Sequence, residues 1–75
     1  AVEQHREALV IARQMDDKRG EGYSLVDLAL DYAALGQRET ALEHLEAGRA
    51  IFAALKAAHQ VTRIEKWMAE VKDAG

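Results

Sequence analysis

An internal repeat of about 40 residues constrains the fold of this 75-residue chain more than any other feature. The matched segments share one offset and are Ala1–Glu3 with Ala41–Glu43, Val10–Ile11 with Ala50–Ile51, and Met15 with Leu55. After Leu55 we expect the offset to shorten to 39, which pairs Leu25, Leu28 and Tyr32 with Ile64, Trp67 and Val71. A repeat of this length is one supersecondary unit, which buries its apolar face by stacking on the next unit.

Apolar periodicity and punctuating residues predict four helices and no strand. The expected ranges are Val2–Met15, Lys18–Leu35, Arg38–Lys56 and His59–Lys72. Asp17 can cap the second helix, because its carboxylate accepts hydrogen bonds from free N–H groups at a helix start. Gly36 can end that helix, because glycine tolerates the left-handed conformation found after a helix C-terminus. No connection is longer than a few residues.

The second helix and the turn after it carry a motif. The sequence reads Leu25-x2-Leu28-Ala29-x2-Tyr32, then Gly36, then Ala41-x3-Leu45. This resembles the tetratricopeptide repeat, whose pattern is a large apolar residue, x2-Leu-Gly-x2-Tyr and Ala-x3-Phe. The family's usual repeat has about 34 residues, and the longer spacing here resembles that of large bacterial regulators and scaffold proteins. Ala29 and Ala41 stand where paired helices cross and small side chains are needed.

The resemblance implies an all-α fold, with antiparallel helix pairs stacked as a four-helix fragment of a right-handed solenoid. It implies one domain over residues 1–75, with one complete repeat from about 22 to 61 and one helix of each neighbouring repeat. Two features depart from the family pattern. Its closing proline is missing, and His5 occupies the position matched by Leu45. The first helix is therefore expected to be imperfectly buried or to stand at an end, and the chain to be part of a longer protein.

Composition argues against several classes of function. The formal charge of −3, with both signs mixed, lacks the basic stripe that nucleic-acid binding requires. No apolar run approaches about 18 residues, so we expect no membrane segment, and there is no signal-peptide pattern. The chain has no cysteine, which excludes disulfides and thiolate metal sites. A reducing compartment fits, and we expect a cytoplasmic protein.

No histidine or glycine motif predicts chemistry. His5, His44 and His59 lie on different predicted helices and form no ligand pair of the HExxH type. Ser24 and Thr40 have no His-Asp arrangement implied around them. The segment 20–22 reads Gly-Glu-Gly but follows no strand, which a phosphate-binding loop requires. We expect no enzyme activity and no cofactor.

Acidic and aromatic clusters also have structural explanations. Asp16, Asp17 and Glu21 lack the alternating spacing of a calcium-binding EF-hand loop. We expect them to cap a helix and to pair with Lys18 and Arg19, and we expect no metal site. Trp67 and Met68 share a helical stripe with Ile64 and Val71, which predicts a core position. The alternative is that Trp67 covers an exposed end or docks a neighbour.

The second helix is apolar almost all round from Tyr23 to Leu35. A helix with this pattern must be covered on most sides. In the tetratricopeptide architecture, the first helix of each repeat is flanked on two sides and its remaining face lines a concave groove. The groove positions this implies on the second helix are Tyr23, Val26, Asp27, Leu30 and Ala33. Their equivalents on the last helix are Thr62, Glu65, Lys66, Ala69 and Lys72.

The residue types at these positions indicate the kind of partner. Some family members hold a C-terminal carboxylate with Lys and Asn in the groove, whereas Val26 and Leu30 stand here. An amphipathic helix or an extended apolar segment is the better match. We therefore expect a non-catalytic protein–protein interaction module from a larger regulatory or scaffold protein. In the alternative, these residues pack on neighbouring repeats or on a second copy, the chain forms a homodimer, and function lies elsewhere in the parent protein.

Overall fold

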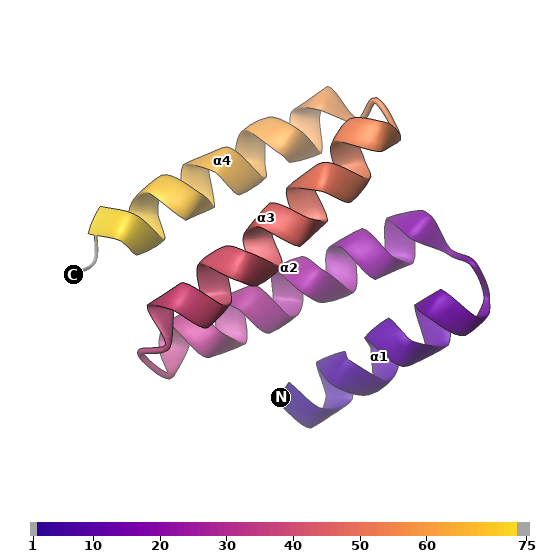
Figure 1. Ribbon diagram of the computed structural model, residues 1–75, viewed down its shortest axis with the longest axis horizontal. Helices are drawn as coiled ribbons and strands as arrows, with labels where there is room; N and C mark the ends of the chain where they lie inside the picture. The colour runs from indigo at the N-terminus through magenta and orange to yellow at the C-terminus, as the bar shows by residue number, and fades with distance from the viewer. Residues whose placement is uncertain (1, 74–75) are drawn as a thin grey trace.

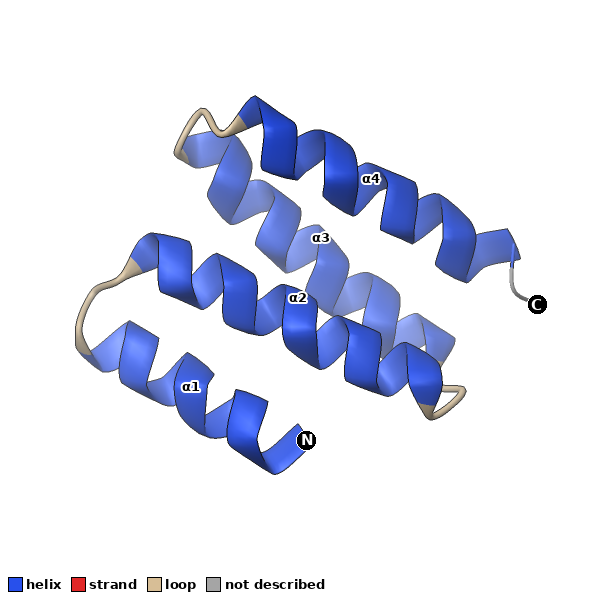
Figure 2. Ribbon diagram, turned by 180° about the vertical axis from the view of Figure 1, so that it is seen from behind, coloured by secondary structure: helices blue, strands red, loops and turns tan. Residues whose placement is uncertain are grey.

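The computed structural model describes residues 2–73 as four helices joined by short turns (Figure 1). The helices are α1 (Val2–Gln14), α2 (Lys18–Ala34), α3 (Arg38–Ala54) and α4 (Ala58–Asp73). These residues contain no strand (Figure 2), so the all-α prediction is confirmed. Each predicted helix end lies within two residues of the observed one. None of the four helices is long and apolar enough to cross a bilayer.

The three turns share one geometry and stand at equal intervals along the chain. Their residues of positive φ are Asp16 (55°), Gly36 (80°) and Lys56 (59°). After α2, the Gly36 N–H donates to the Ala33 carbonyl at 3.0 Å and the Gln37 N–H donates to the Tyr32 carbonyl at 2.9 Å. This is the Schellman arrangement, which satisfies carbonyls left free at a helix C-terminus. The same two bonds recur in the turns before and after, so α2 and α3, each with the turn that follows it, occupy 20 residues.

The regular turns correct the expected repeat offset. The first residues of α2 and α4 are Lys18 and Ala58, so the offset stays at 40 after Leu55 and does not shorten to 39. Burial alone does not separate the two offsets, because Ser24 and Leu25, the two possible equivalents of buried Ile64, are both buried. Matching by apolar residue type failed because α4 buries a different side from the one that dominates α2. One residue of offset turns a helix by about 100°, since a turn has about 3.6 residues.

Each helix packs on its neighbours in the chain, and α2 and α3 lie between α1 and α4 (Figures 1 and 2). The core is centred on these two inner helices. Its largest fully buried side chains are Phe52, Leu28, Leu45 and Ile64. The end helices contribute narrower buried stripes, with Leu9 and Ala12 on α1 and Ile64 and Val71 on α4.

Small residues let α2 and α3 approach each other closely. Ala29 and Ala41, expected at the helix crossing, are both fully buried. Two glycines complete the contact. A Cβ atom on Gly22 would lie 2.8 Å from the Phe52 ring, and one on Gly48 would lie 3.3 Å from Val26 Cγ2. Position 22 therefore requires glycine at this helix separation, whereas position 48 would accept alanine only with a small shift of its neighbour.

Candidate interaction surface

An open hollow of about 230 Å³ lies between α2 and α4. Its floor is apolar and comes from three helices, with Val26 from α2, Phe52 from α3 and Ile64 from α4, all buried. The residues around this floor are more exposed and are Tyr23, Asp27, Leu30, Gln60, Arg63 and Trp67. The hollow therefore has the plan of a small protein-binding surface, in which a polar and aromatic rim surrounds an apolar centre.

Aromatic side chains shape the rim. Tyr23 is 46% exposed and packs edge-on against Phe52, with 5.0 Å between the ring centroids. Gln60 Nε2 donates a hydrogen bond to the Tyr23 hydroxyl at 3.2 Å, which joins α2 to α4 across the hollow. The Arg63 guanidinium stands 5.1 Å from the centre of the Trp67 ring, within the range of a cation–π contact. Tyrosine, tryptophan and arginine are the residues that most often anchor protein interfaces.

The rim carries charges of both signs. Asp27 contributes a carboxylate whose side chain is 52% exposed, and Arg63 contributes the opposite charge from α4. His5 on α1 lies near this carboxylate, with its Nε2 atom 3.9 Å from Asp27 Oδ2. The other ring nitrogen, Nδ1, donates to Asp31 Oδ2 at 2.6 Å. Asp27 is thus the more exposed of the two carboxylates beside His5.

The size of the hollow limits what it can hold. Pockets for small molecules usually measure about 300–1,000 Å³, so this volume better suits one or two apolar side chains of a protein segment. Among residues 2–73, no three histidine or acidic side chains are grouped so that they could hold a metal ion. The three histidines stay on separate helices, and His44 donates its Nδ1 hydrogen to the Thr40 carbonyl at 2.8 Å.

The predicted groove residues of α2 divide into three kinds of position. Tyr23, Asp27 and Leu30 are exposed and line the rim. Val26 lines the floor and is only 6% exposed, so it belongs to the core as well as to the hollow. Ala33 is half-buried, packs against the core and lies outside the hollow. Contact with a partner would therefore depend mainly on the rim residues.

The predicted groove residues of α4 do not line the hollow. These residues are Thr62, Glu65, Lys66 and Ala69, and all four are exposed. Lys72 lines a separate surface depression near Gly36 and Leu42. The cause is the repeat offset, because an offset of 40 relates Tyr23 to Arg63 and so turns α4 by one residue. An offset of 40 would have predicted Arg63 and Trp67, the equivalents of Tyr23 and Asp27. Gln60 and Ile64 correspond to Gly20 and Ser24, which lie outside the predicted groove.

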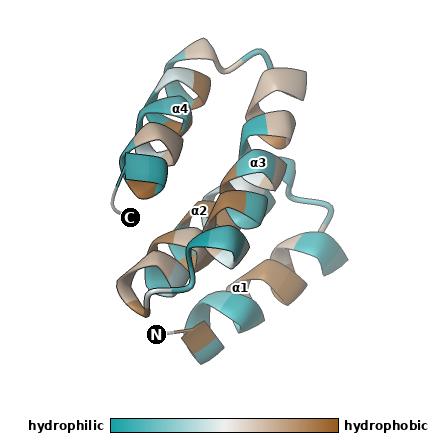
Figure 3. Ribbon diagram, turned by 60° about the vertical axis from the view of Figure 1, so that its left-hand side comes forward, coloured by the Kyte–Doolittle hydropathy of each residue, from teal (hydrophilic) through white to brown (hydrophobic). Residues whose placement is uncertain are grey.

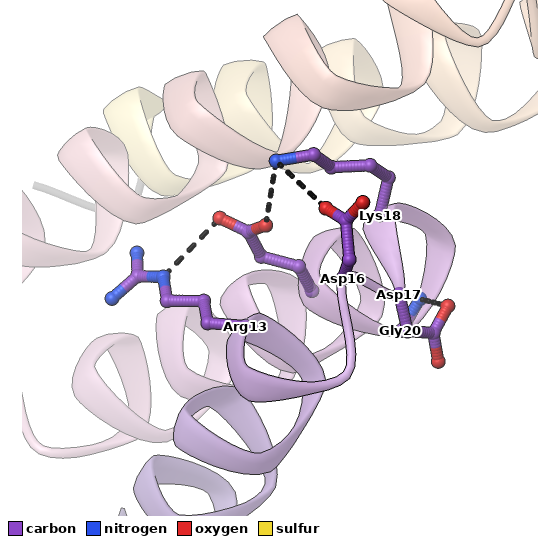
Figure 4. Close-up of polar contacts among 6 residues, drawn as sticks. Arg13, Asp16, Asp17, Lys18 and Gly20 are labelled. Carbon is purple, nitrogen blue, oxygen red and sulfur yellow. Dashed lines mark hydrogen bonds and ion pairs between the residues drawn. The ribbon is translucent and has the colours of Figure 1, made fainter.

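The acidic cluster at the α1–α2 junction has a structural role (Figure 4). Asp17 caps α2 by accepting a hydrogen bond from the Gly20 backbone N–H at 3.0 Å. Glu21 pairs with Arg13 at 3.2 Å and with Lys18 at 3.7 Å, and Lys18 also lies 3.9 Å from Asp16. The expected capping and ion pairing are therefore present, although Lys18 forms these pairs and Arg19 does not.

Two arginines are held in place by neighbouring side chains. Arg6 donates to the Tyr32 hydroxyl at 2.9 Å, and this hydrogen bond raises the pKa of Arg6. Arg49 is hydrogen-bonded to Glu46 and, at 3.3 Å, to Glu65, and these contacts raise the pKa of Arg49. Both groups keep their positive charge. Arg6 joins α1 to α2, and Arg49 joins α3 to α4 and also contacts Glu46 on its own helix.

Trp67 was expected in the core. It is half-buried and packs against the core, and it also lines the hollow.

Comparison with known proteins identifies no relative. No family model matches the chain, and neither a curated protein nor a solved structure matches it. The function of the surface is therefore inferred from its geometry and charge.

Proposed function

We propose that this chain is a non-catalytic protein–protein interaction module of tetratricopeptide type, belonging to a larger cytoplasmic regulatory or scaffold protein. In this proposal the four helices form a fragment of a right-handed solenoid. Three facts support the assignment. The helix-and-turn units recur every 20 residues, the motif residues Leu28, Ala29 and Leu45 are fully buried, and each helix packs on the next.

The observation that carries the proposed function is the hollow between α2 and α4. Its apolar floor lies between an aromatic residue from each helix, Tyr23 and Trp67. A partner that inserts one or two large apolar side chains would exclude water from this floor, and burial is worth about 25 cal/mol for each Å² of apolar surface. Asp27 and Arg63 would orient such a segment by charge. An amphipathic helix or an extended apolar segment has both features.

Selection from a random peptide library, followed by titration of the selected peptides, tests this proposal. We expect peptides with closely spaced large apolar residues to bind the unmodified chain. Leu30→Asp should weaken their binding at least tenfold, because it places a charge beside the apolar floor. The matched control is Val10→Asp, which alters an exposed residue of α1 away from the hollow and should leave binding unchanged. Peptides that bind both variants equally would refute the proposed site.

A second candidate function is self-association, with the biological activity elsewhere in the parent protein. It is favoured by the exposed apolar side chains on α1, where Val10, Ile11 and Met15 are 52%, 53% and 72% exposed. Exposed apolar patches often mark interaction sites. Sedimentation or light scattering over a wide concentration range distinguishes the two candidates. A chain that stays monomeric while binding a peptide through the hollow would rule out the homodimer.

A further inference from the structure

The two end helices, α1 and α4, present different surfaces. Each can be compared with the equivalent surface inside the molecule, where α2 and α3 pack together. By the 40-residue offset, α1 is equivalent to α3 and α4 is equivalent to α2. The packed α2–α3 pair therefore shows which side chains a further helix would meet at either end. It shows the surface with which α2 receives α3, and the surface with which α3 receives α2.

At the α4 end, the side chains do not suit another helix. The surface of α2 that receives α3 includes Gly22, Leu25 and Val26, all buried. Their equivalents on α4 are Thr62, Glu65 and Lys66, all exposed. Because a single Cβ atom at Gly22 would already lie 2.8 Å from Phe52, a threonine at the same place prevents the close approach. Two charged side chains replace the two apolar ones, so this surface resembles the polar outer face of a capping helix.

At the α1 end, the side chains suit another helix. The surface of α3 that receives α2 includes His44, Gly48 and Ile51, which lie against Tyr32, Val26 and Gly22 respectively. The equivalent residues of α1 are Gln4, Ala8 and Ile11, with Met15 equivalent to Leu55. All four are exposed, Ile11 by 53% and Met15 by 72%. Figure 3 shows hydrophobic segments on α1 between hydrophilic ones. We call the surface formed by these four residues the free face of α1.

We propose that the free face of α1 docks an amphipathic helix of the α2 kind, running antiparallel to α1, whereas α4 closes the other end of the stack. The occupant follows from the covered pair, since the same surface on α3 is occupied by α2. A second copy of this chain fits less well. Its own α2 surface is already covered by α3, and the outer surface of its α4 presents Thr62, Glu65 and Lys66.

The packing also restricts the docking helix at one position. A Cβ atom on Gly48 would stand 3.3 Å from Val26 Cγ2, closer than ordinary contact. Ala8 has such a Cβ atom where α3 has Gly48. A helix that docks on α1 as α2 docks on α3 therefore fits more closely with a side chain smaller than valine, such as alanine, at the position equivalent to Val26.

Two extended chains test the proposal. In the first, an extra copy of residues 18–40 carrying Val26→Ala precedes Ala1, just as Thr40 precedes Ala41. In the second, an extra copy of residues 36–57 follows Gly75, the residue equivalent to Leu35. We expect the first extension to raise Tm by at least about 4 °C, the shift typical of a modest stabilisation in a domain of this size. It should also slow hydrogen exchange of α1 amides. The second extension should change Tm by less than about 2 °C.

Substitutions on the free face separate docking from a general effect of added length. Ile11→Lys should abolish the gain in Tm of the first extended chain, while in the unextended chain it replaces an exposed residue and should leave Tm nearly unchanged. Retaining valine in the copied segment should reduce the gain. Equal stabilisation by both extensions, or a gain that survives Ile11→Lys, would overturn the proposal. So would an unextended chain that sediments as a dimer and becomes monomeric on Ile11→Lys, because a second copy would then be the occupant.

Discussion

The α1–α2 and α3–α4 interfaces are equivalent in the repeat. At two positions, however, one interface has a polar pair where the other has an apolar pair. Where α3 and α4 place Leu45 and Val71 in the core, α1 and α2 place His5 and Asp31, joined at 2.6 Å. At a second position the exchange runs the other way. Buried Leu9 and Leu25 on α1 and α2 correspond to Arg49 and Glu65 on α3 and α4, an ion pair at 3.3 Å.

This exchange shows that the helix pair accepts either chemistry at a position if both partners change together. A carboxylate left opposite leucine would lose its hydrogen bonds, and a buried polar group without a partner is costly. His5 replaces the apolar residue that the repeat has at Leu45, and Asp31 compensates from 26 residues away. The side chain of His5 is accordingly half-buried, which agrees with the expectation of an imperfectly buried first helix. Four experiments, ordered by the size of the expected effect, test the comparison.

The largest effect is expected from Leu45→Ala, which alters the apolar pair equivalent to His5 and Asp31. Leu45 is fully buried, and truncating a buried leucine typically costs about 2–5 kcal/mol because it leaves a cavity. His5→Ala at the equivalent position should cost less than about 1 kcal/mol, as expected for a partly exposed pair. Urea unfolding followed by circular dichroism measures both values. Equal losses would contradict the distinction between the two interfaces.

The next effect concerns the junctions that lead into α2 and α3. Asp17 caps α2 through its side chain, whereas Gln37 makes no side-chain cap at the start of α3. Asp17→Ala should therefore lower the free energy of unfolding by about 0.5–2 kcal/mol. Gln37→Ala is the matched control and should change it by less than about 0.5 kcal/mol. If the control loses as much, side-chain capping is not what separates the two junctions.

A smaller effect of opposite sign is expected from converting the first interface into a copy of the second. The double substitution His5→Leu with Asp31→Val should raise the free energy of unfolding by about 1 kcal/mol, because well-packed apolar replacements of a partly buried polar pair are often stabilising. Asp31→Val alone should be destabilising, since His5 then loses its acceptor. A double variant less stable than either single variant would show that the pair contributes more than its apolar replacement.

The smallest effect is expected from the exposed pair of the second interface. Arg49→Gln with Glu65→Gln removes an ion pair whose side chains are 35% and 52% exposed. Exposed pairs contribute little to stability and are screened by salt. The urea midpoint should shift less than for any substitution above, and the shift should disappear at high salt. A large shift that persists in high salt would mean that this pair contributes as much to stability as the buried pair Leu9 and Leu25.

Much of the fold could be predicted because its signals are local. The apolar periods define four helices, and Asp17 and Gly36 mark the junctions on either side of α2 within a few residues. The crossing residues Ala29 and Ala41 were predicted from the motif that resembles the tetratricopeptide pattern, in which small side chains stand where paired helices cross. The roles of Gly22 and Gly48 were not found, since the need for glycine arises from Phe52 and Val26 on the opposite helix. Nothing in the local sequence specifies that distance.

The sequence by itself determined the helices, their turns and the α2 side of the hollow, where Tyr23, Val26, Asp27 and Leu30 lie together. Only the tertiary structure decided which side of α4 meets them. Apolar matching favoured one offset and the turn geometry selects another, and the difference of one residue turns α4 by about 100°. That rotation directs Arg63 and Trp67 to the hollow and leaves Thr62, Glu65 and Lys66 outside. The facing of an end helix depends on the side chains of the helix it packs against, here α3, and the apolar pattern of α4 alone does not specify them.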